Sequence, residues 1–446
     1  MRRTWGRSAH PARIVPFAFL MAIIVGTVLL SLPYATPGPE RPPVLTAAFT
    51  AVSAVCVTGL TTVDTATYWS PFGQTVILVL IQAGGFGIMT LATLLGMLAG
   101  GKLRLSSSLI AQAETHTRNV GDVRHVVRRV AIVMLCFEAA FAAVLTVRFR
   151  ATYDDSWAEA VWHGVFHSVS AFNNAGFALY SDNLIGFVAD AWIMFPICVA
   201  IVVGGIGFPV LFELRRRWRA PRTWSVHTRL TVYGSAILLV AGVGAFLALE
   251  WTNPATLGGL GPWGRIVAGV TGGVVPRTAG FNSIDYGQIT PETMAVNYVL
   301  MFIGGGSAGT AGGIKVTTFF LLAFVIWSEV RGERETNVAH RQIGGSTVRQ
   351  ALTVVLLALA VIAVGTMVIL LATDHPLDVV LFETISAFAT VGLSTGITPQ
   401  LPASADITLM VLMFVGRVGT ITVASALALK SRHRHFHLPE ERPVIG

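Results

Sequence analysis

The chain has 446 residues, of which 53% are hydrophobic and only 12% charged, and its mean hydropathy is +0.68. These values are typical of an integral membrane protein and exclude an ordinary soluble domain. The net charge of +8 does not indicate nucleic-acid binding, because the cations are concentrated in short segments between apolar stretches. The expected surroundings are a lipid bilayer, with no nucleic acid as partner.

The positive residues predict the orientation in the membrane. Most of the 31 lysines and arginines fall in segments 1–13, 102–129, 215–229, 331–349 and 430–442. Because cationic loops tend to stay on the cytoplasmic side, we expect these segments and both termini in the cytoplasm, with an even number of spans. The first apolar run lacks a small-residue cleavage site after it, so we expect it to be retained as a span.

Eight apolar stretches are long enough to cross a bilayer as helices. They lie near 14–32, 73–99, 126–147, 190–212, 229–250, 293–326, 350–372 and 406–429. A shorter apolar run lies between the two members of each pair, near 44–57, 159–173, 263–276 and 377–389. These runs are too short to span, which indicates re-entrant half-helices followed by extended strands. Such backbone is tolerated at membrane depth only where it is buried or lines a water-filled cavity.

A glycine in a similar setting follows each of the four short runs, at intervals of roughly a quarter of the chain. One polypeptide is therefore expected to surround one pore, in which backbone carbonyls replace the water around a cation. Since all four positions are glycine, no side chain narrows one quadrant, and we expect potassium to be preferred over sodium. The predicted K⁺ selectivity filter consists of Val57, Thr58, Gly59, Asn174, Ala175, Gly176, Thr278, Ala279, Gly280, Thr390, Val391 and Gly392.

The predicted fold is an all-α membrane protein. Eight transmembrane helices form four span, pore-helix, filter and span repeats with pseudo-fourfold symmetry around one pore. The expected boundaries are 1–101 for the first repeat, 102–219 for the second, 220–332 for the third, and 333–446 for the fourth with a short basic cytoplasmic tail. The pore helices would direct the negative ends of their dipoles toward the cavity, which favours cations.

The second span of the third repeat is unusually rich in glycine. Six glycines in ten residues, 304–313, would expose backbone and interrupt a helix. We therefore expect an intramembrane loop beneath the filter that blocks or clears the pore. Lys315, just after it, either anchors the cytoplasmic side of the loop or extends to water. The predicted gate consists of Gly304, Gly305, Gly306, Ser307, Ala308, Gly309, Thr310, Ala311, Gly312, Gly313, Lys315 and Arg417.

Three charged residues lie near the predicted pore. Arg417 is in the last span, where a cation costs on the order of 3 kcal/mol to insert, so it should face a cavity or a partner. It either pairs with Glu138 or Glu383, or forms a positive barrier under the filter that contacts the gate loop. Arg277 and Glu383 flank filter strands, and we expect them to pair behind the filter as its support.

A family resemblance is carried by the stretches 56–60, 166–177, 277–281, 304–315, 386–393 and Gly416-Arg417. Together they resemble the Trk/Ktr/HKT potassium transporter superfamily, and most closely the bacterial KtrB type of membrane subunit. The resemblance implies a homodimer with one pore per subunit in the bacterial inner (plasma) membrane. It also implies a cytoplasmic nucleotide-binding regulatory ring, KtrA-like, that gates the pore.

Alternatives remain at this point. Within transport, the chain could be a TrkH-like or sodium-permeable subunit, and uptake could be channel-like or symport, with or without sodium dependence. A protein of another class, a haem-binding membrane redox protein, would use histidines such as His163 and His167, four residues apart on one helical face. The chain has no Walker sequence and no nucleophile-and-base constellation. We therefore expect that the chain is not an enzyme and binds no cofactor, and that any nucleotide is bound by a partner subunit.

Overall fold

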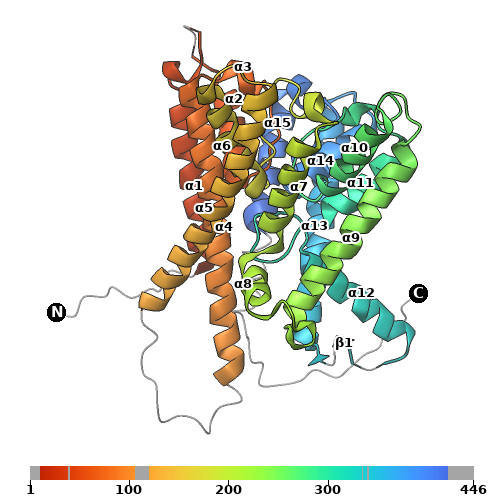
Figure 1. Cartoon of the computed structure of the whole chain (residues 1–446). Coiled ribbons are helices and arrows are strands. Elements are labelled where there is room, and N and C mark those ends of the chain that lie inside the picture. The colour runs from red at the N-terminus through yellow and green to blue at the C-terminus, as the bar shows by residue number, and fades with distance from the viewer. Residues whose placement is uncertain (1–10, 39–40, 106–119, 334, 339–340, 420–446) are drawn as a thin grey trace, which may run out of the picture.

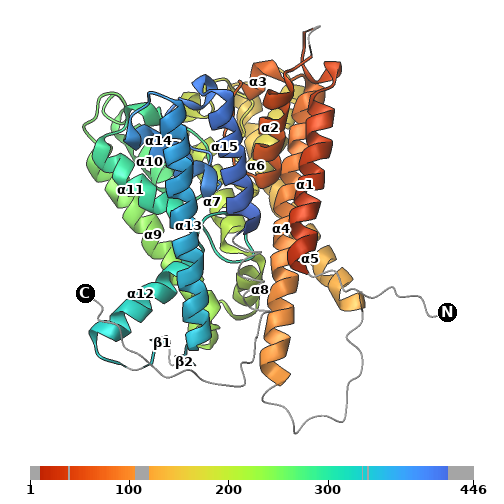
Figure 2. The ribbon, with the colours of Figure 1, turned by 180° about the vertical axis from the view of Figure 1, so that it is seen from behind.

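The computed structural model describes residues 11–38, 41–105, 120–333, 335–338 and 341–419. The described chain is mostly helical, and Figure 1 shows long helices standing side by side around shorter ones. The only strands in these residues are β1 (Asn337–Val338) and β2 (Arg341–Gln342), which pair antiparallel. They lie at the lower end of the molecule, beside the lower ends of α12 and α13 (Figure 2).

Four short helices occur where the short apolar runs predict pore helices. Figure 1 shows them in the upper half of the molecule, each followed by an irregular segment that contains one of the four glycines. These helices are α2 (Val44–Cys56), α6 (Trp157–Phe172), α10 (Pro262–Val274) and α14 (Leu377–Phe388).

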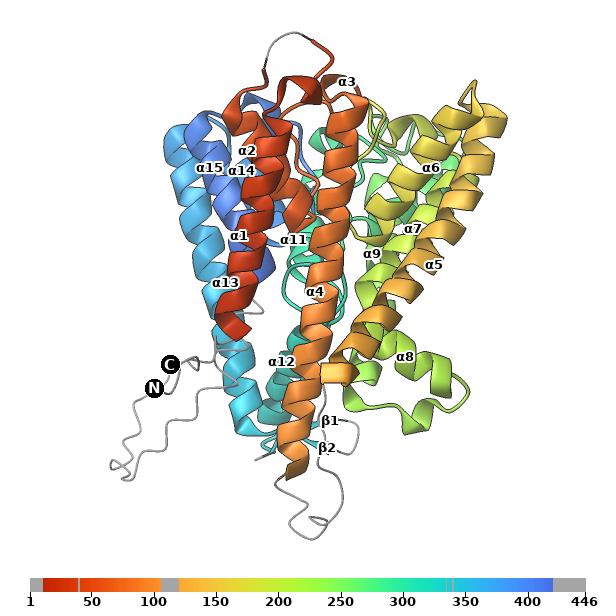
Figure 3. The ribbon, with the colours of Figure 1, turned by 90° about the vertical axis from the view of Figure 1, so that its left-hand side faces the viewer.

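Each short helix packs against at least two other helices. α2 lies between α1 (Pro11–Leu30) and α4 (Pro71–Leu105), as the side view in Figure 3 shows. α6 lies against α5 (Val120–Thr152) and α7 (Ala191–Ile206), and α14 against α13 (Gly345–Ala372) and α15 (Ala403–Phe414). α10 packs on α9 (Val226–Glu250) and on α7 of the preceding quarter. The other three short helices likewise contact a helix of the preceding quarter.

By length and apolarity, four helices in the described residues can cross a membrane. They are α4, α5, α9 and α13. The pair α7 and α8 (Phe208–Arg217) is a fifth candidate if it counts as one bent span. The count of eight spans stays a prediction.

One predicted span is wrong in its course. The stretch 190–212 is not one helix but the pair α7 and α8, bent by 98°. The break falls at Gly207, whose φ of 97° is left-handed and whose successor Phe208 is followed by a proline. Proline at the first turn favours a new helix and cannot continue the old one. The residues Gly207-Phe208-Pro209 therefore carried a helix-break signal that the apolar pattern alone did not show.

The predicted span at 293–326 is interrupted as expected. α11 (Pro291–Phe302) ends before the glycine-rich stretch, and α12 (Val316–Val330) begins after it. We call the non-helical residues 303–315 the glycine loop. α15 passes into a π-helical turn, Val415–Gly419, and the rest of the predicted span up to 429 lies outside the described residues.

The remaining elements are short. They are α3 (Thr65–Tyr68) and the 3₁₀ turns η1 (Pro33–Ala35), η2 (Ile185–Phe187), η3 (Pro221–Thr223), η4 (Tyr286–Gln288) and η5 (Thr398–Gln400).

Candidate ion-conduction site

The four glycine segments converge on one place. A β-carbon on Gly59 would approach the carbonyl oxygen of Ala175 closely, and one on Gly176 would lie 2.8 Å from that of Ala279. In the same way Gly280 faces the carbonyl of Val391, and Gly392 faces that of Thr58. Each glycine thus borders the segment of the next quarter, and the fourth borders the first. The order of contacts is a closed ring of four.

The backbone of the ring repeats one unusual conformation. In each segment the glycine has a positive φ, between 65° and 94°. The residue two positions before it also has a positive φ, although it is not glycine: Val57, Asn174, Thr278 or Thr390. Such non-glycine residues are uncommon and mark functional or strained backbone. The four segments therefore share a geometry as well as a sequence pattern.

Four carbonyl oxygens of the ring have no hydrogen-bond donor in the described part of the chain. The oxygens that face the neighbouring glycines belong to Thr58, Ala175, Ala279 and Val391. Among the described residues, no hydrogen-bond donor is bonded to any of these four oxygens. Buried carbonyls normally find a donor, so four unpaired ones at one place need water or a cation.

Serines that sequence analysis overlooked hold three of the segments. They stand six residues before the glycine. The hydroxyls of Ser53 and Ser386 accept hydrogen bonds from the amides of Gly59 and Gly392, both at 3.1 Å, and Ser170 donates to the carbonyl of Phe177 at 2.7 Å. The third quarter has Val274 at this position. The recurrence at a fixed distance from the glycine was visible in the sequence.

Glycines in the long helices allow these helices to approach the pore helices closely. A β-carbon on Gly84 would overlap the carbonyl of Val55, and one on Gly204 or Gly416 would overlap that of Phe172 or Phe388. Those three carbonyls lie four residues before a filter glycine, at equivalent positions. These glycines therefore set the distance between span and pore helix, as small residues commonly do in membranes.

Replacing Gly84 with alanine is expected to destabilise the protein by about 1–3 kcal/mol, because the new methyl group has no room against the backbone of α2. Gly87 on the same helix is the matched control, since a β-carbon there meets only Phe19, at an ordinary 3.8 Å. Gly87→Ala should gain up to about 1 kcal/mol from helix propensity. Thermal unfolding of both purified variants in detergent measures the difference, and equal midpoints would contradict the packing argument.

The glycine loop is seated on the break between α7 and α8. The amide of Gly306 donates to the carbonyl of Gly205 at 2.8 Å, and the amide of Thr310 donates to that of Gly204 at 3.1 Å. In return, the amide of Phe208 donates to the carbonyl of Ala308 at 3.4 Å. The backbone polar groups at the two helix breaks thus form hydrogen bonds with each other. Irregular backbone at membrane depth requires such internal partners.

The loop also touches the predicted filter segments. The hydroxyl of Thr310 is 2.9 Å from the side-chain oxygen of Asn174 and 3.3 Å from the carbonyl of Phe172. A β-carbon on Gly312 would meet the hydroxyl of Thr390. The predicted gate residues 304–313 therefore lie directly against the second and fourth filter segments.

Both cations of the predicted gate bind the loop backbone. The guanidinium of Arg417 is 2% exposed and donates to the carbonyl of Thr310, not to Glu138 or Glu383. Glu138 instead accepts from Gln82 and Asn173. The ammonium of Lys315 donates to the carbonyl of Ala311 at 2.6 Å. Of the two alternatives for each cation, contact with the loop is the one the structure has.

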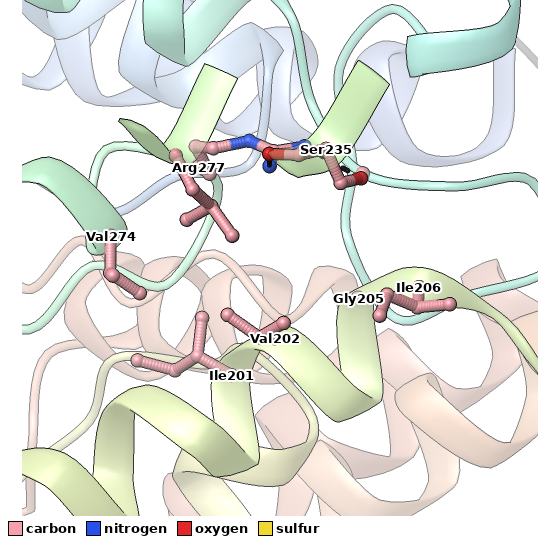
Figure 4. Close-up of a pocket in the computed structure, with 9 residues that line it drawn as sticks. Ile201, Val202, Gly205, Ile206, Ser235, Val274 and Arg277 are labelled. Atoms are coloured by element: carbon pink, nitrogen blue, oxygen red, sulfur yellow. Dashed lines mark hydrogen bonds between the residues drawn. The ribbon is translucent and has the colours of Figure 1, made fainter. Parts of the chain in front are cut away.

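The expected pairing of Arg277 with Glu383 is wrong. Arg277 donates to the carbonyls of Ser235 and Gly304, each at 3.1 Å, so it joins the third filter segment to α9 and to the start of the glycine loop. Figure 4 shows Arg277 and Ser235 beside a cavity of about 20 Å³, room for one water molecule. Glu383 accepts its hydrogen bonds from residues 394–398, beyond the fourth filter glycine. In place of the expected ion pair, Arg277 donates to backbone carbonyls and Glu383 accepts from the segment after the fourth filter glycine.

The two histidines of the haem alternative are already engaged. The Nδ1 of His163 is 3.0 Å from a carboxylate oxygen of Asp154. Both ring nitrogens of His167 have partners, namely the carbonyl of His163 and the amide of Leu179. In the described part of the chain, no three His, Cys, Asp or Glu side chains are grouped so as to hold a metal ion. His167 therefore uses both ring nitrogens in hydrogen bonds within the protein.

Comparison with known proteins agrees with this architecture. The family described as "TrkH: Cation transport protein" matches residues 15–240 and 246–435. In three dimensions the chain is similar to the potassium transporter TrkH from Vibrio parahaemolyticus, with a TM-score of 0.70, over 94% of this chain and 86% of that one. The two share 18% sequence identity, so the likeness concerns the fold.

Relatives of higher identity extend over almost the whole length. The chain is 38% identical to the Ktr system potassium uptake protein B of Bacillus subtilis, covering 98% of this chain and 97% of the relative. It is 35% identical to the protein of the same name from Vibrio alginolyticus, over 100% and 97%. It is also 32% identical to the potassium/sodium uptake protein NtpJ of Enterococcus hirae, over 100% and 99%. The chain is a multi-pass membrane protein that belongs to the TrkH family of cation transport proteins, within the Trk/Ktr/HKT superfamily.

Proposed function

We propose that the protein is the potassium-translocating membrane subunit of a Ktr-type uptake system. The observation that carries the proposal is the closed ring of four glycine segments with unpaired carbonyls at its centre. In this proposal eight spans form four repeats, with boundaries at 101, 219 and 332, around a single pore. Dehydrated potassium passes between carbonyls from all four quarters.

The glycine loop and Arg417 form the gate. The loop lies against the filter segments, and Arg417 and Lys315 fix it through the carbonyls of Thr310 and Ala311. A cation at this depth also repels potassium that leaves the filter. Conduction requires the loop to move, which breaks these hydrogen bonds.

Uptake follows the membrane potential, which is worth about 2.3 kcal/mol per charge per 100 mV. This chain then needs neither a cofactor nor nucleotide hydrolysis. Potassium is the proposed ion because two of the relatives above are potassium uptake proteins; the name of the third includes sodium, so a sodium-permeable or TrkH-like activity is the second candidate.

The proposed assembly is a homodimer in the bacterial plasma membrane with both termini in the cytoplasm. A KtrA-like nucleotide-binding ring docks on the cytoplasmic side, on the basic segments 100–125, 213–229 and 328–349 and on the tail after Lys430. The proposal is supported by the Ktr system named for the relatives and by the run of arginines 215–217 at the end of α8.

Rescue of a potassium-uptake-deficient bacterium at low external potassium tests the function. The intact chain, co-expressed with a candidate regulatory subunit, is expected to restore growth and potassium uptake, with sodium uptake much slower. The control is the same vector without the chain. No rescue with the protein present in the membrane would contradict the proposal, and equal uptake of both ions would favour the sodium-permeable candidate.

A further inference from the structure

Two ionisable side chains occupy the same position in different quarters of the ring. His167 and Glu383 each stand nine residues before a filter glycine, on α6 and α14. Both are completely buried. Nothing in the ion path described above uses either of them.

Both side chains accept a hydrogen bond from equivalent backbone amides. The Nε2 of His167 is 3.3 Å from the amide nitrogen of Leu179, and the Oε1 of Glu383 is 2.8 Å from that of Thr395. Leu179 and Thr395 each stand three residues after their filter glycine. A histidine and a glutamate thus make one and the same contact, between the middle of a pore helix and the outer end of its filter segment.

Other contacts fix the acceptors. The Nδ1 of His167 is 2.7 Å from the carbonyl of His163, so Nδ1 carries the proton and Nε2 keeps its lone pair. The same carboxylate of Glu383 also accepts from the hydroxyls of Ser394 at 2.7 Å and Thr398 at 2.9 Å. Each acceptor is therefore held in position by contacts other than its hydrogen bond to the filter amide.

The other two quarters lack this contact. The equivalent residues are Thr50 and Thr271; the hydroxyl of Thr50 has no partner among the described residues, and that of Thr271 donates to Val267 within its own helix. The outer ends of these quarters are bound instead to the loop after the second filter segment. The hydroxyl of Ser181 donates to the carboxylate of Asp64 at 2.6 Å, and the backbone amide of Asn282 donates to the side-chain oxygen of Asn183 at 3.3 Å.

We propose that His167 and Glu383 are a pair of positioning residues that fix the outer ends of the second and fourth filter segments and so determine ion discrimination. In the ring the first quarter borders the second, the second the third, and so on, which makes these two quarters opposite each other. The ring of four carbonyls is thus supported by two residues, which lie in opposite quarters. Loss of one acceptor leaves a buried amide unpaired, and the segment then shifts to find another partner.

This inference rests on the proposed function, and its test uses the ratio of apparent KM values for sodium and potassium in uptake measurements. His167→Leu and Glu383→Leu remove the acceptor and are expected to lower the preference for potassium roughly tenfold each. His167→Gln and Glu383→Gln retain an acceptor oxygen and should restore most of the preference. Thr50→Val is the matched control in the first quarter and should leave the ratio unchanged.

The outcomes separate the two claims. If the intact chain takes up no potassium, the proposed function fails. If it does, and the leucine variants keep the wild-type ratio, or Thr50→Val alters it as much, the positioning role is wrong. A purely structural role would lower the amount of protein and the maximal rate but not the ion ratio.

A second measurement does not depend on the folding of any variant. Hydrogen exchange of the intact protein should be slower at the amides of Leu179 and Thr395 than at the amide of Thr62, which makes no such bond to Thr50. Equal exchange at all three amides would overturn the proposal even if transport is normal.

Discussion

Replacement of Gly392 with alanine is expected to abolish selective potassium uptake. A β-carbon at this position would overlap the carbonyl oxygen of Thr58 in the neighbouring filter segment, and the residue has a φ of 94°, which side chains rarely adopt. The ring would have to widen or turn one carbonyl away. We expect a loss of at least about a hundredfold in uptake at low potassium, since displaced oxygens no longer replace the water around the ion.

Gly396 separates the two causes of this effect. It has the same φ of 94°, but a β-carbon there meets nothing within 4 Å. Gly396→Ala therefore carries the backbone strain without the collision and should retain most of the uptake. Potassium uptake at matched protein levels is the measurement. Similar losses in both variants would mean that strain, and not the overlap with Thr58, is responsible.

Replacement of Arg417 with glutamine is expected to raise the maximal rate of potassium uptake several-fold. The change removes both the positive charge under the filter and the guanidinium that binds the carbonyl of Thr310. A hydrogen bond from a charged group contributes about 1.5–3 kcal/mol, so the closed position of the loop should lose much of its advantage. Expression should stay normal, because the loop keeps its contacts with Gly204 and Gly205.

Arg417→Lys distinguishes charge from contact. Lysine retains the positive charge but is a compact donor that does not reproduce the reach of the guanidinium. If repulsion by the charge limits the rate, the lysine variant should resemble wild type; if the bond to Thr310 does, it should resemble the glutamine variant. Transport kinetics of Arg417→Gln identical to wild type would remove Arg417 from the gate.

The sequence was sufficient to locate the four short helices and the break in the glycine-rich stretch. Apolar runs too short to span predicted the four short helices, and the six glycines of residues 304–313 predicted the interruption between α11 and α12. These features depend on local composition, which can be seen without any tertiary contact. The grouping of the four glycines followed from their regular spacing.

Contacts between distant residues were predicted less well. Opposite charge suggested that Arg277 and Glu383 pair, but Arg277 donates to the carbonyls of Ser235 and Gly304, and Glu383 accepts from a backbone amide. Such backbone partners leave no trace in residue identity. The break at Gly207 was missed for a different reason, because hydropathy averages over a helix and does not register a bend.

The joint between the glycine loop and the second quarter ties two movements together. Should the loop withdraw, the carbonyls of Gly204 and Gly205 and the amide of Phe208 would lose their partners in a region with little water. Either water must enter there, or α8 must swing with the loop. α8 ends in three consecutive arginines, so a force that a partner applies to this helix would be transmitted to the glycine loop.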